Sequence, residues 1–263
     1  MAALAFDQAG KGPAVVLLHG FPLCRRMWDP QVEALAEAGY RVIVPDLPGY
    51  GESPLEGPAS MDLYADEVVR LLDRLGIDRA VVGGMSMGGY ILCNLLDRHP
   101  ERLSAAMFLM TRAAADDAEA KQRRTKLAEL AESGNLEPIA DAFEAILFAP
   151  GGAARRPELV RRVRSWMLAT PPAGVAGGLL AMRDRRDMVD RLAAFDLPAL
   201  VVGAELDVAI PMGHAKILAE NLPQGRLEVI PGAGHIANLE EPELFSSILC
   251  DYLAGLDLPD PEG

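Results

Sequence analysis

The chain has 263 residues, of which half are apolar and 24% are charged. This apolar content excludes an intrinsically disordered chain, and no apolar run approaches the ~18 residues that a membrane span requires. The 25 basic and 38 acidic side chains give a net charge of −13, and such a surface repels polyanions. We therefore expect a globular protein that binds neither nucleic acid nor membrane.

The cysteines are few and odd in number. Cys24, Cys93 and Cys250 form neither a disulfide framework nor a paired metal-binding motif, which is typical of a reducing compartment. Residues 1–10 contain Asp7 and no basic side chain, unlike a secretory signal. We expect a cytoplasmic monomer or homodimer that uses no metal ion and no organic cofactor.

Strand-like and helix-like segments alternate before residue 110 and again after residue 190. Short apolar runs that suit buried parallel strands are Ala14–Leu18, Arg41–Val44, Ala80–Gly83, Leu103–Leu109, Ala199–Gly203 and Leu227–Ile230. Apolar residues at helical spacing lie between them, over 28–39, 64–76, 91–99, 214–221 and 242–252. This alternation predicts an α/β fold with a mostly parallel central sheet flanked by helices.

Residues 111–190 interrupt this alternation and predict a separate helical segment. They contain helical stretches at about Ala118–Ala131, Glu137–Ile146 and Pro157–Leu168, and no clear strand. We therefore divide the chain into a core domain, 1–110 and 191–263, and a helical cap (lid) insertion, 111–190. The insertion holds 13 basic and 12 acidic residues. We interpret this balance as Arg–acid pairs on helix surfaces rather than as a specific anion site.

The main chemical signal is Gly84-Met85-Ser86-Met87-Gly88, a G-x-S-x-G motif between a predicted strand and a predicted helix. In that context a serine lies on a sharp turn that lifts its hydroxyl clear of the backbone. Gly84 and Gly88 allow the strand and the helix to approach closely. The helix N-terminus directs free N–H groups toward the site. Ser86 is therefore the candidate nucleophile.

A nucleophilic serine needs a base, and the base needs an acid that fixes its tautomer. His235 follows the last predicted strand, at the sheet edge where α/β proteins gather functional residues. Asp207 follows the penultimate strand by four residues, and the order Ser86, Asp207, His235 is the one expected for this architecture. Glu205 is the competing acid, and we prefer Asp207. The histidines outside this set are His19, His99 and His214.

With these motifs, the chain resembles α/β-hydrolase-fold serine hydrolases over almost its full length. The other matching motifs are His19–Pro22 after a strand, Asp46–Ser53, and Asn238–Pro242 after Gly234-His235. It is most similar to small esterases and to the enol-lactonase and non-haem haloperoxidase groups. The resemblance implies a cap inserted after the sixth strand. The short N-terminus implies that one or both of the leading antiparallel strands are missing.

The resemblance also assigns roles to residues around the serine. It implies that the backbone N–H groups of Phe21 and Met87 form an oxyanion hole, and that His19 and the loop 46–53 support the site structurally. Residues expected to bind substrate, between Ser86 and the cap, are Trp166, Met110 and Met182. Arg112 either contacts a polar group of the substrate or pairs with a nearby aspartate, and Cys24 is a candidate pocket wall.

These observations lead to a serine esterase that forms an acyl-enzyme on a small-molecule ester. The first alternative is a lactonase, which applies the same chemistry to an enol-lactone or a related cyclic ester. A perhydrolase or haloperoxidase-like activity and carbon–carbon bond hydrolysis are further alternatives with the same triad. A non-catalytic ligand-binding or signalling protein on this fold is the alternative from another class, because a fold alone does not fix a function.

Overall fold

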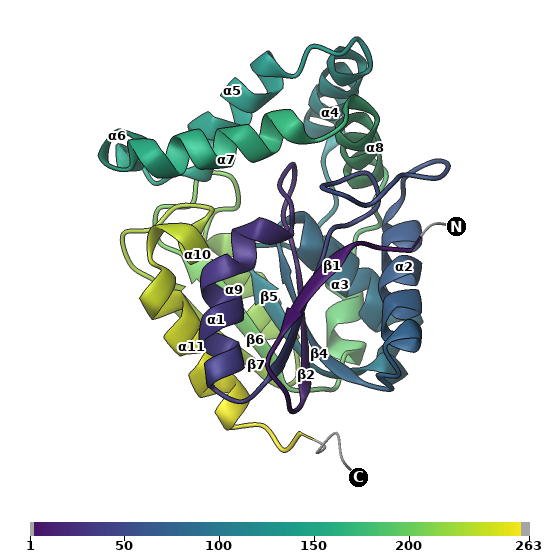
Figure 1. The fold of residues 1–263 in the computed structure, drawn as a ribbon, viewed down its shortest axis with the longest axis vertical. Helices are drawn as coiled ribbons and strands as arrows, with labels where there is room; N and C mark the ends of the chain where they lie inside the picture. The colour runs from purple at the N-terminus through teal and green to yellow at the C-terminus, as the bar shows by residue number, and fades with distance from the viewer. Residues whose placement is uncertain (1–2, 259–263) are drawn as a thin grey trace.

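The computed structural model describes residues 3–258. Its centre is a seven-stranded sheet in the order β1-β3-β2-β4-β5-β6-β7 (Figure 1). β1 runs antiparallel to β3, and the other neighbouring strands are parallel. The strands are β1 (Phe6–Ala9), β2 (Ala14–Leu18), β3 (Arg41–Pro45), β4 (Ala80–Met85), β5 (Leu103–Leu109), β6 (Ala199–Ala204) and β7 (Gly225–Ile230).

Both faces of the sheet are covered, which explains the nearly unbroken apolar strands. On β2, Val16 and Leu18 belong to the apolar cluster on one face, whereas Val15 and Leu17 belong to the cluster on the other. All four side chains are fully buried. The predicted α/β fold is confirmed, and the six predicted strands coincide with β2 to β7.

Helices pack on both faces of the sheet (Figure 1). α1 packs against α11 on one face, and α2 packs against α3 on the opposite face, which α9 also covers. Among residues 3–258, no helix is long and apolar enough to cross a membrane. The helices before α4 and after α8 are η1 (Arg25–Trp28), α1 (Asp29–Glu37), α2 (Met61–Arg74), α3 (Met87–Arg98), η2 (Pro100–Arg102), η3 (Val189–Ala194), α9 (Gly213–Asn221), α10 (Ala237–Glu240) and α11 (Pro242–Ala254).

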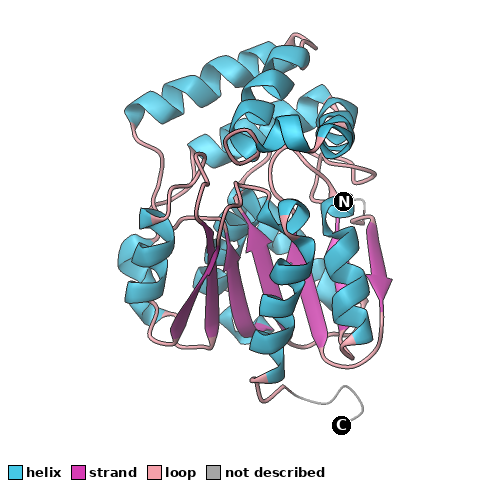
Figure 2. Ribbon diagram, turned by 90° about the vertical axis from the view of Figure 1, so that its left-hand side faces the viewer, coloured by secondary structure: helices cyan, strands magenta, loops and turns pink. Residues whose placement is uncertain are grey.

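Helices α4 to α8, between β5 and β6, form a layer above the carboxyl ends of the parallel strands (Figures 1 and 2). We call α4 to α8 the cap helices. They follow the fifth strand, and the expected position after the sixth was wrong, because only one antiparallel strand, β1, precedes the parallel ones within residues 3–258. The cap helices are α4 (Ala118–Glu132), α5 (Glu137–Leu147), α6 (Gly152–Arg155), α7 (Pro157–Ala169) and α8 (Pro172–Arg183).

Helix α8 was not predicted from the sequence, because its composition opposes helix formation. It contains Gly174, Gly177 and Gly178, and glycine in a helix costs about 1 kcal/mol relative to alanine. A Cβ on Gly174 would collide with the backbone oxygen of Gly49. A Cβ on Gly178 would collide with the hydroxyl of the buried Tyr50. The glycines therefore let α8 lie directly against the 46–53 loop of the core.

This contact predicts that Gly174→Ala destabilises the protein by about 2 kcal/mol, since the added methyl meets backbone rather than a movable side chain. Urea unfolding measures the loss. Gly213→Ala at the start of α9 is the matched control, because its methyl would meet nothing within 4 Å. Equal stability of the two variants would contradict the close packing of α8 on the core.

Candidate active site

Ser86 lies in a strained turn between β4 and α3. Its φ of 53° and ψ of −110° lie in a region that non-glycine residues rarely adopt, and such strain is characteristic of functional sites. A Cβ on Gly84 would collide with the carbonyl of Gly88, and a Cβ on Gly88 would collide with the carbonyl of Leu18. The two glycines of the motif are therefore required by close backbone packing.

Hydrogen bonds hold the strained turn in place. The Ser86 N–H donates to the carbonyl of Leu109 at 3.0 Å, which ties the turn to the end of β5. The Ser86 carbonyl accepts from the Gly89 N–H at 3.0 Å and from the hydroxyl of Thr111 at 2.7 Å. With its backbone fixed, Ser86 remains partly exposed, although its neighbours in β4 and α3 are buried.

His235 and Asp207 form a buried pair. The imidazole Nδ1 lies 2.7 Å from Asp207 Oδ2, and both side chains are at most 5% exposed. Asp207 Oδ1 accepts from the N–H groups of Ala209 and Ile210, each at 2.8 Å. A carboxylate only accepts hydrogen bonds, so Nδ1 donates and Nε2 is left as the proton acceptor. This is the arrangement that a histidine base requires.

The competing acid, Glu205, has a different position. Its side chain is exposed, and its carboxylate accepts a 2.9 Å hydrogen bond from the Gly232 N–H. Of the two acids considered from the sequence, the structure places Asp207 against the imidazole. Glu205 instead holds the loop that leads to His235.

The loop that carries His235 is attached to the cap through Glu240. The carboxylate of Glu240 accepts from the Gly234 N–H at 2.7 Å and from the Ala149 N–H, between α5 and α6, at 3.2 Å. Arg156 approaches the same carboxylate at 3.6 Å. A Cβ on Gly234 would collide with the backbone nitrogen of Ala149. The position of His235 is thus linked to the position of the cap.

Two backbone N–H groups next to Ser86 are free to bind a ligand oxygen. Among residues 3–258, no acceptor binds the N–H of Phe21 or of Met87. A Cβ added to Gly20 would come within 3.5 Å of the Ser86 Cβ, so the 19–22 loop runs directly beside the serine. Met87 begins α3, where the helix dipole adds positive potential. These are the two N–H groups that the family resemblance names.

The remaining histidines differ in their surroundings. His19 accepts from the Leu47 N–H at 3.0 Å through Nε2, and Nδ1 lies 2.9 Å from the Gly20 carbonyl. Burial lowers the pKa of His19 and keeps it neutral, so it bridges two loops as a structural residue. His99 lies near the surface, 3.1 Å from Asp66.

A cavity of about 620 Å³ opens above Ser86, and its size is typical of a small-molecule site. We call it the Ser86 cavity. Ser86 and His235 both line it. Its apolar wall includes Phe21 from the core and Phe143 and Ile146 from α5, so core and cap helices enclose it together.

Of the three residues expected to bind substrate, Met182 lines this cavity and the other two do not. Trp166 on α7 lies under the guanidinium of Arg162, whose carbon is 5.5 Å from the ring centroid. Met110 is fully buried in the core, and its N–H donates to the carbonyl of Val202 at 2.8 Å. The structure therefore places Trp166 and Met110 outside the cavity, because the packing of α7 and of the end of β5 turns both side chains elsewhere.

Sequence analysis did not identify Asp116, Arg124 and His214 as residues that line the cavity. Burial, followed by the charges of Arg112 and Arg185, lowers the pKa of His214. No local motif marks these residues. The only signal was the basic content of the 111–190 segment, which does not indicate where the side chains point.

Asp116 is the buried centre of a charge cluster. Arg112, Arg124 and Arg185 all pair with its carboxylate, and the Arg185 distance is 2.8 Å. Burial alone raises the pKa of Asp116, but the hydrogen bonds from Arg185 and Arg124 outweigh it and lower the pKa to about 2. We call these four residues the Asp116 cluster, and at neutral pH it holds three positive charges and one negative charge.

Cys24 contributes neither to the wall of the cavity nor to its chemistry. It is absent from the cavity lining, and burial raises the pKa of its thiol to about 11. The neutral thiol is a poor nucleophile. Within residues 3–258, no group of three or more His, Cys, Asp or Glu side chains is arranged to hold a metal ion.

Comparisons with known proteins agree with this fold. Residues 13–242 match the family model for the alpha/beta hydrolase fold. A thermophilic esterase from Thermogutta terrifontis, in a malate-bound structure, has a TM-score of 0.93 and 37% identity, and the match covers 95% of this chain and 93% of that one.

Two relatives are similar in sequence along nearly the whole chain. The 3-oxoadipate enol-lactonase 2 of Acinetobacter baylyi is 31% identical over 92% of this chain and 88% of its own length. A putative non-heme bromoperoxidase of Mycobacterium tuberculosis is 33% identical over 97% of this chain and 99% of its own. The resemblance to esterases, enol-lactonases and haloperoxidases is thereby confirmed.

The Asp116 cluster generates a prediction about acid stability. The folded-state pKa of about 2 lies below the usual 3.8, so the ionised carboxylate stabilises the fold above pH 3.8 and this contribution is lost as the pH falls toward 2. We expect the stability difference between wild type and Asp116→Asn to shrink by about 2 kcal/mol over that range, measured by urea unfolding. Asp251→Asn, an exposed change on α11, is the control. A pH-independent difference for Asp116→Asn would contradict the pairing.

Proposed function

Because the chain belongs to the alpha/beta hydrolase family, we propose that it hydrolyses carboxylic esters through a covalent intermediate on Ser86. The esterase and enol-lactonase relatives support ester hydrolysis in general. One observation carries the serine mechanism: Ser86 and His235 face the same cavity, and Asp207 binds the far nitrogen of the imidazole.

In the acylation step, Ser86 Oγ attacks the ester carbonyl while His235 Nε2 takes the hydroxyl proton. Asp207 holds the imidazole in the required tautomer and stabilises the imidazolium that forms. The tetrahedral oxyanion receives hydrogen bonds from the N–H groups of Phe21 and Met87. One such donor is typically worth about 3 kcal/mol in the transition state. His235 then gives its proton to the departing alcohol, which leaves the acyl group on Ser86.

Deacylation repeats these steps with water. His235 accepts a proton from a water molecule, and the resulting nucleophile attacks the acyl-enzyme carbonyl. The bond to Ser86 Oγ breaks, the proton returns from His235 to the serine, and the carboxylic acid is released. No further group is needed in this scheme.

In the same proposal, residues 111–190 are a cap and residues 1–110 and 191–263 are the core. The cavity supports this division, because the cap supplies the wall around Phe143 and the core supplies Ser86 and Phe21. The cap selects the substrate, while the core performs the chemistry. We assign the substrate as a small-molecule ester, in keeping with the cavity volume of about 620 Å³.

A lactone is the second candidate substrate. The enol-lactonase of Acinetobacter baylyi and the solved enol-lactonase of the same fold favour it. The steps are unchanged, except that the alcohol remains attached to the acyl group after ring opening. Measured values of kcat/KM on open esters and on lactones of similar size separate the two candidates.

The serine mechanism predicts that Ser86→Ala lowers the kcat for p-nitrophenyl esters about ten-thousandfold or more, because the nucleophile is removed. Initial rates on esters of increasing acyl length measure the loss and show how long a chain the cavity takes. Ser165→Ala on α7, an exposed serine, is the matched control and keeps wild-type rates. Comparable turnover by Ser86→Ala and wild type would overturn the proposal.

The assignment of the acid yields a second prediction. Asp207→Asn should lower kcat about ten-thousandfold, since an amide in that position favours the wrong imidazole tautomer. Glu205→Gln removes a nearby carboxylate that does not contact the imidazole, and it should change kcat by less than about threefold. If Glu205→Gln has the larger effect, Glu205 rather than Asp207 supports the base.

A further inference from the structure

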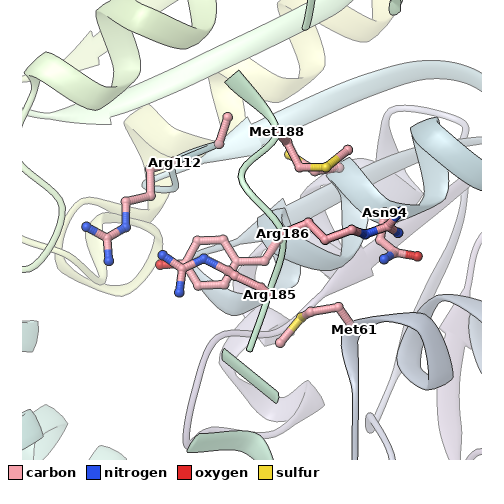
Figure 3. Close-up of a pocket in the computed structure, with 9 residues that line it drawn as sticks. Met61, Asn94, Arg112, Arg185, Arg186 and Met188 are labelled. Atoms are coloured by element: carbon pink, nitrogen blue, oxygen red, sulfur yellow. The ribbon is translucent and has the colours of Figure 1, made fainter. Parts of the chain in front are cut away.

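The Asp116 cluster lies at the boundary between core and cap, next to the proposed nucleophile. Arg112 comes directly after Thr111, whose hydroxyl binds the Ser86 carbonyl. Arg124 lies on α4 and Arg185 follows α8. Figure 3 shows the guanidinium groups of Arg112 and Arg185 together, on the side away from Arg186 and Asn94. The loop after β5, helix α4 and the segment after α8 thus bring their cations to one carboxylate.

One carboxylate does not satisfy three guanidinium groups. Asp116 Oδ1 accepts from Arg112 and from Arg185, and Oδ2 accepts from Arg124. Arg185 also donates to the carbonyls of Met182 and Ala114. The Nε atoms of Arg112 and Arg185 are nevertheless buried without a hydrogen-bond partner among residues 3–258. Buried, unpartnered charged donors are costly, so the cluster is suited to accept a second anion.

Arg112, which carries one of these unsatisfied donors, belongs to the wall of the Ser86 cavity. Arg112, Asp116 and Arg124 line that cavity together with Ser86 and His235. Arg185 lies behind them, with its guanidinium carbon 4.2 Å from the ring centroid of Tyr90. The surplus positive charge therefore faces the space where the proposed substrate binds.

The other charged residues on the cavity wall are already paired or exposed. Arg123 binds Glu119 at 3.0 Å, and both side chains are exposed. Asp117 accepts from the Ala120 N–H at 2.7 Å and caps α4. His214 also lines the cavity, and burial and the charges of Arg112 and Arg185 lower its pKa, which favours its neutral form. None of these residues neutralises the two surplus charges of the cluster.

The cavity is therefore apolar on one side and cationic on another. Phe21, Leu127, Phe143 and Ile146 supply apolar surface. A matching substrate has an ester or lactone carbonyl at Ser86, an apolar spacer, and an anionic group at the arginines. Arginine forks match planar carboxylates in two-point hydrogen bonding, and in the Asp116 cluster each arginine uses only one nitrogen on the carboxylate.

We propose that Arg112, with Arg124, binds a substrate carboxylate that is remote from the reacting carbonyl, so that the preferred substrates are esters or lactones of carboxylate-bearing acids or alcohols. This inference rests on the proposed function and names the substrate class of the same site. It replaces the interpretation that the basic residues of the 111–190 segment serve only in pairs on helix surfaces. Arg185, one of these basic residues, is buried and pairs with Asp116.

The test compares substrates that differ in one carboxylate. Mono-p-nitrophenyl adipate and p-nitrophenyl hexanoate place the difference on the acyl side, and 3-acetoxybenzoate and phenyl acetate place it on the alcohol side. We expect wild type to have a higher kcat/KM for the anionic member of at least one pair. In Arg112→Met, the ratio of kcat/KM for the anionic ester to kcat/KM for its neutral counterpart should fall about tenfold, mainly because KM for the anionic ester rises. Arg112→Lys should restore part of it, since it returns the charge without the fork.

Arg112→Met keeps two cations on Asp116, Arg124 and Arg185, so the buried carboxylate remains paired. Arg161→Met on α7 is the matched control, because Arg161 is exposed, pairs with Glu158 and does not line the cavity. It removes the same charge and should leave the preference unchanged. A loss in Arg161→Met equal to that in Arg112→Met would assign the effect to overall charge and overturn the inference.

Binding without turnover provides an independent measurement. Adipate should raise the melting temperature of wild type and of Ser86→Ala, and should have less effect on Arg112→Met; its neutral diamide should have no effect on any of them. If the protein hydrolyses neutral esters but shows neither a preference for carboxylate-bearing substrates nor a shift in melting temperature with adipate, this inference is overturned while the proposed function stands. Turnover that survives Ser86→Ala would instead overturn the proposed function, whichever substrate is preferred.

Discussion

The close approach of β4 and α3 at Ser86 is the constraint on which the rest of the site depends. Gly84 and Gly88 permit it, and the hydrogen bond from the Ser86 N–H to Leu109 holds the turn at a positive φ. With the serine fixed there, the N–H of Met87 points out of the first turn of α3, and the 19–22 loop passes beside it. The nucleophile and the two oxyanion donors of the proposed mechanism are thus set by packing in the sheet, independently of the substrate.

The positions of the base and of the cap depend on contacts between separate loops and helices. Asp207 fixes the imidazole of His235, while Glu240 ties the neighbouring Gly234 to Ala149 in the cap. The glycines of α8 bring the other side of the cap against the core. A change in cap position is therefore transmitted to the histidine loop as well as to the cavity wall. In this account the cap both selects the substrate and helps to place the base.

The sequence predicted the parts of the molecule that local chemistry determines. Parallel strands are recognisable because both faces are buried, and Ser86 because a nucleophilic turn needs glycine on both sides. From the sequence, Asp207 could be preferred to Glu205 only because of its position after β6. The structure agrees with this preference, since Asp207 lies 2.7 Å from the imidazole of His235. The residues that line the Ser86 cavity could not be predicted from the sequence. Trp166 and Met182 look equally suitable as sequence, and only the packing of α7 and α8 separates them.

The central claim is that Ser86 carries the covalent intermediate, and a serine-reactive organophosphorus ester tests it most directly. The activated hydroxyl attacks the phosphorus atom and displaces its leaving group, which gives a phosphoryl adduct that water hydrolyses only slowly. Intact mass and peptide mapping should find one adduct per chain on Ser86, appearing in step with the loss of esterase activity and missing from Ser86→Ala and His235→Ala. Inactivation with the label on another residue, or full activity after complete labelling of Ser86, would contradict the account.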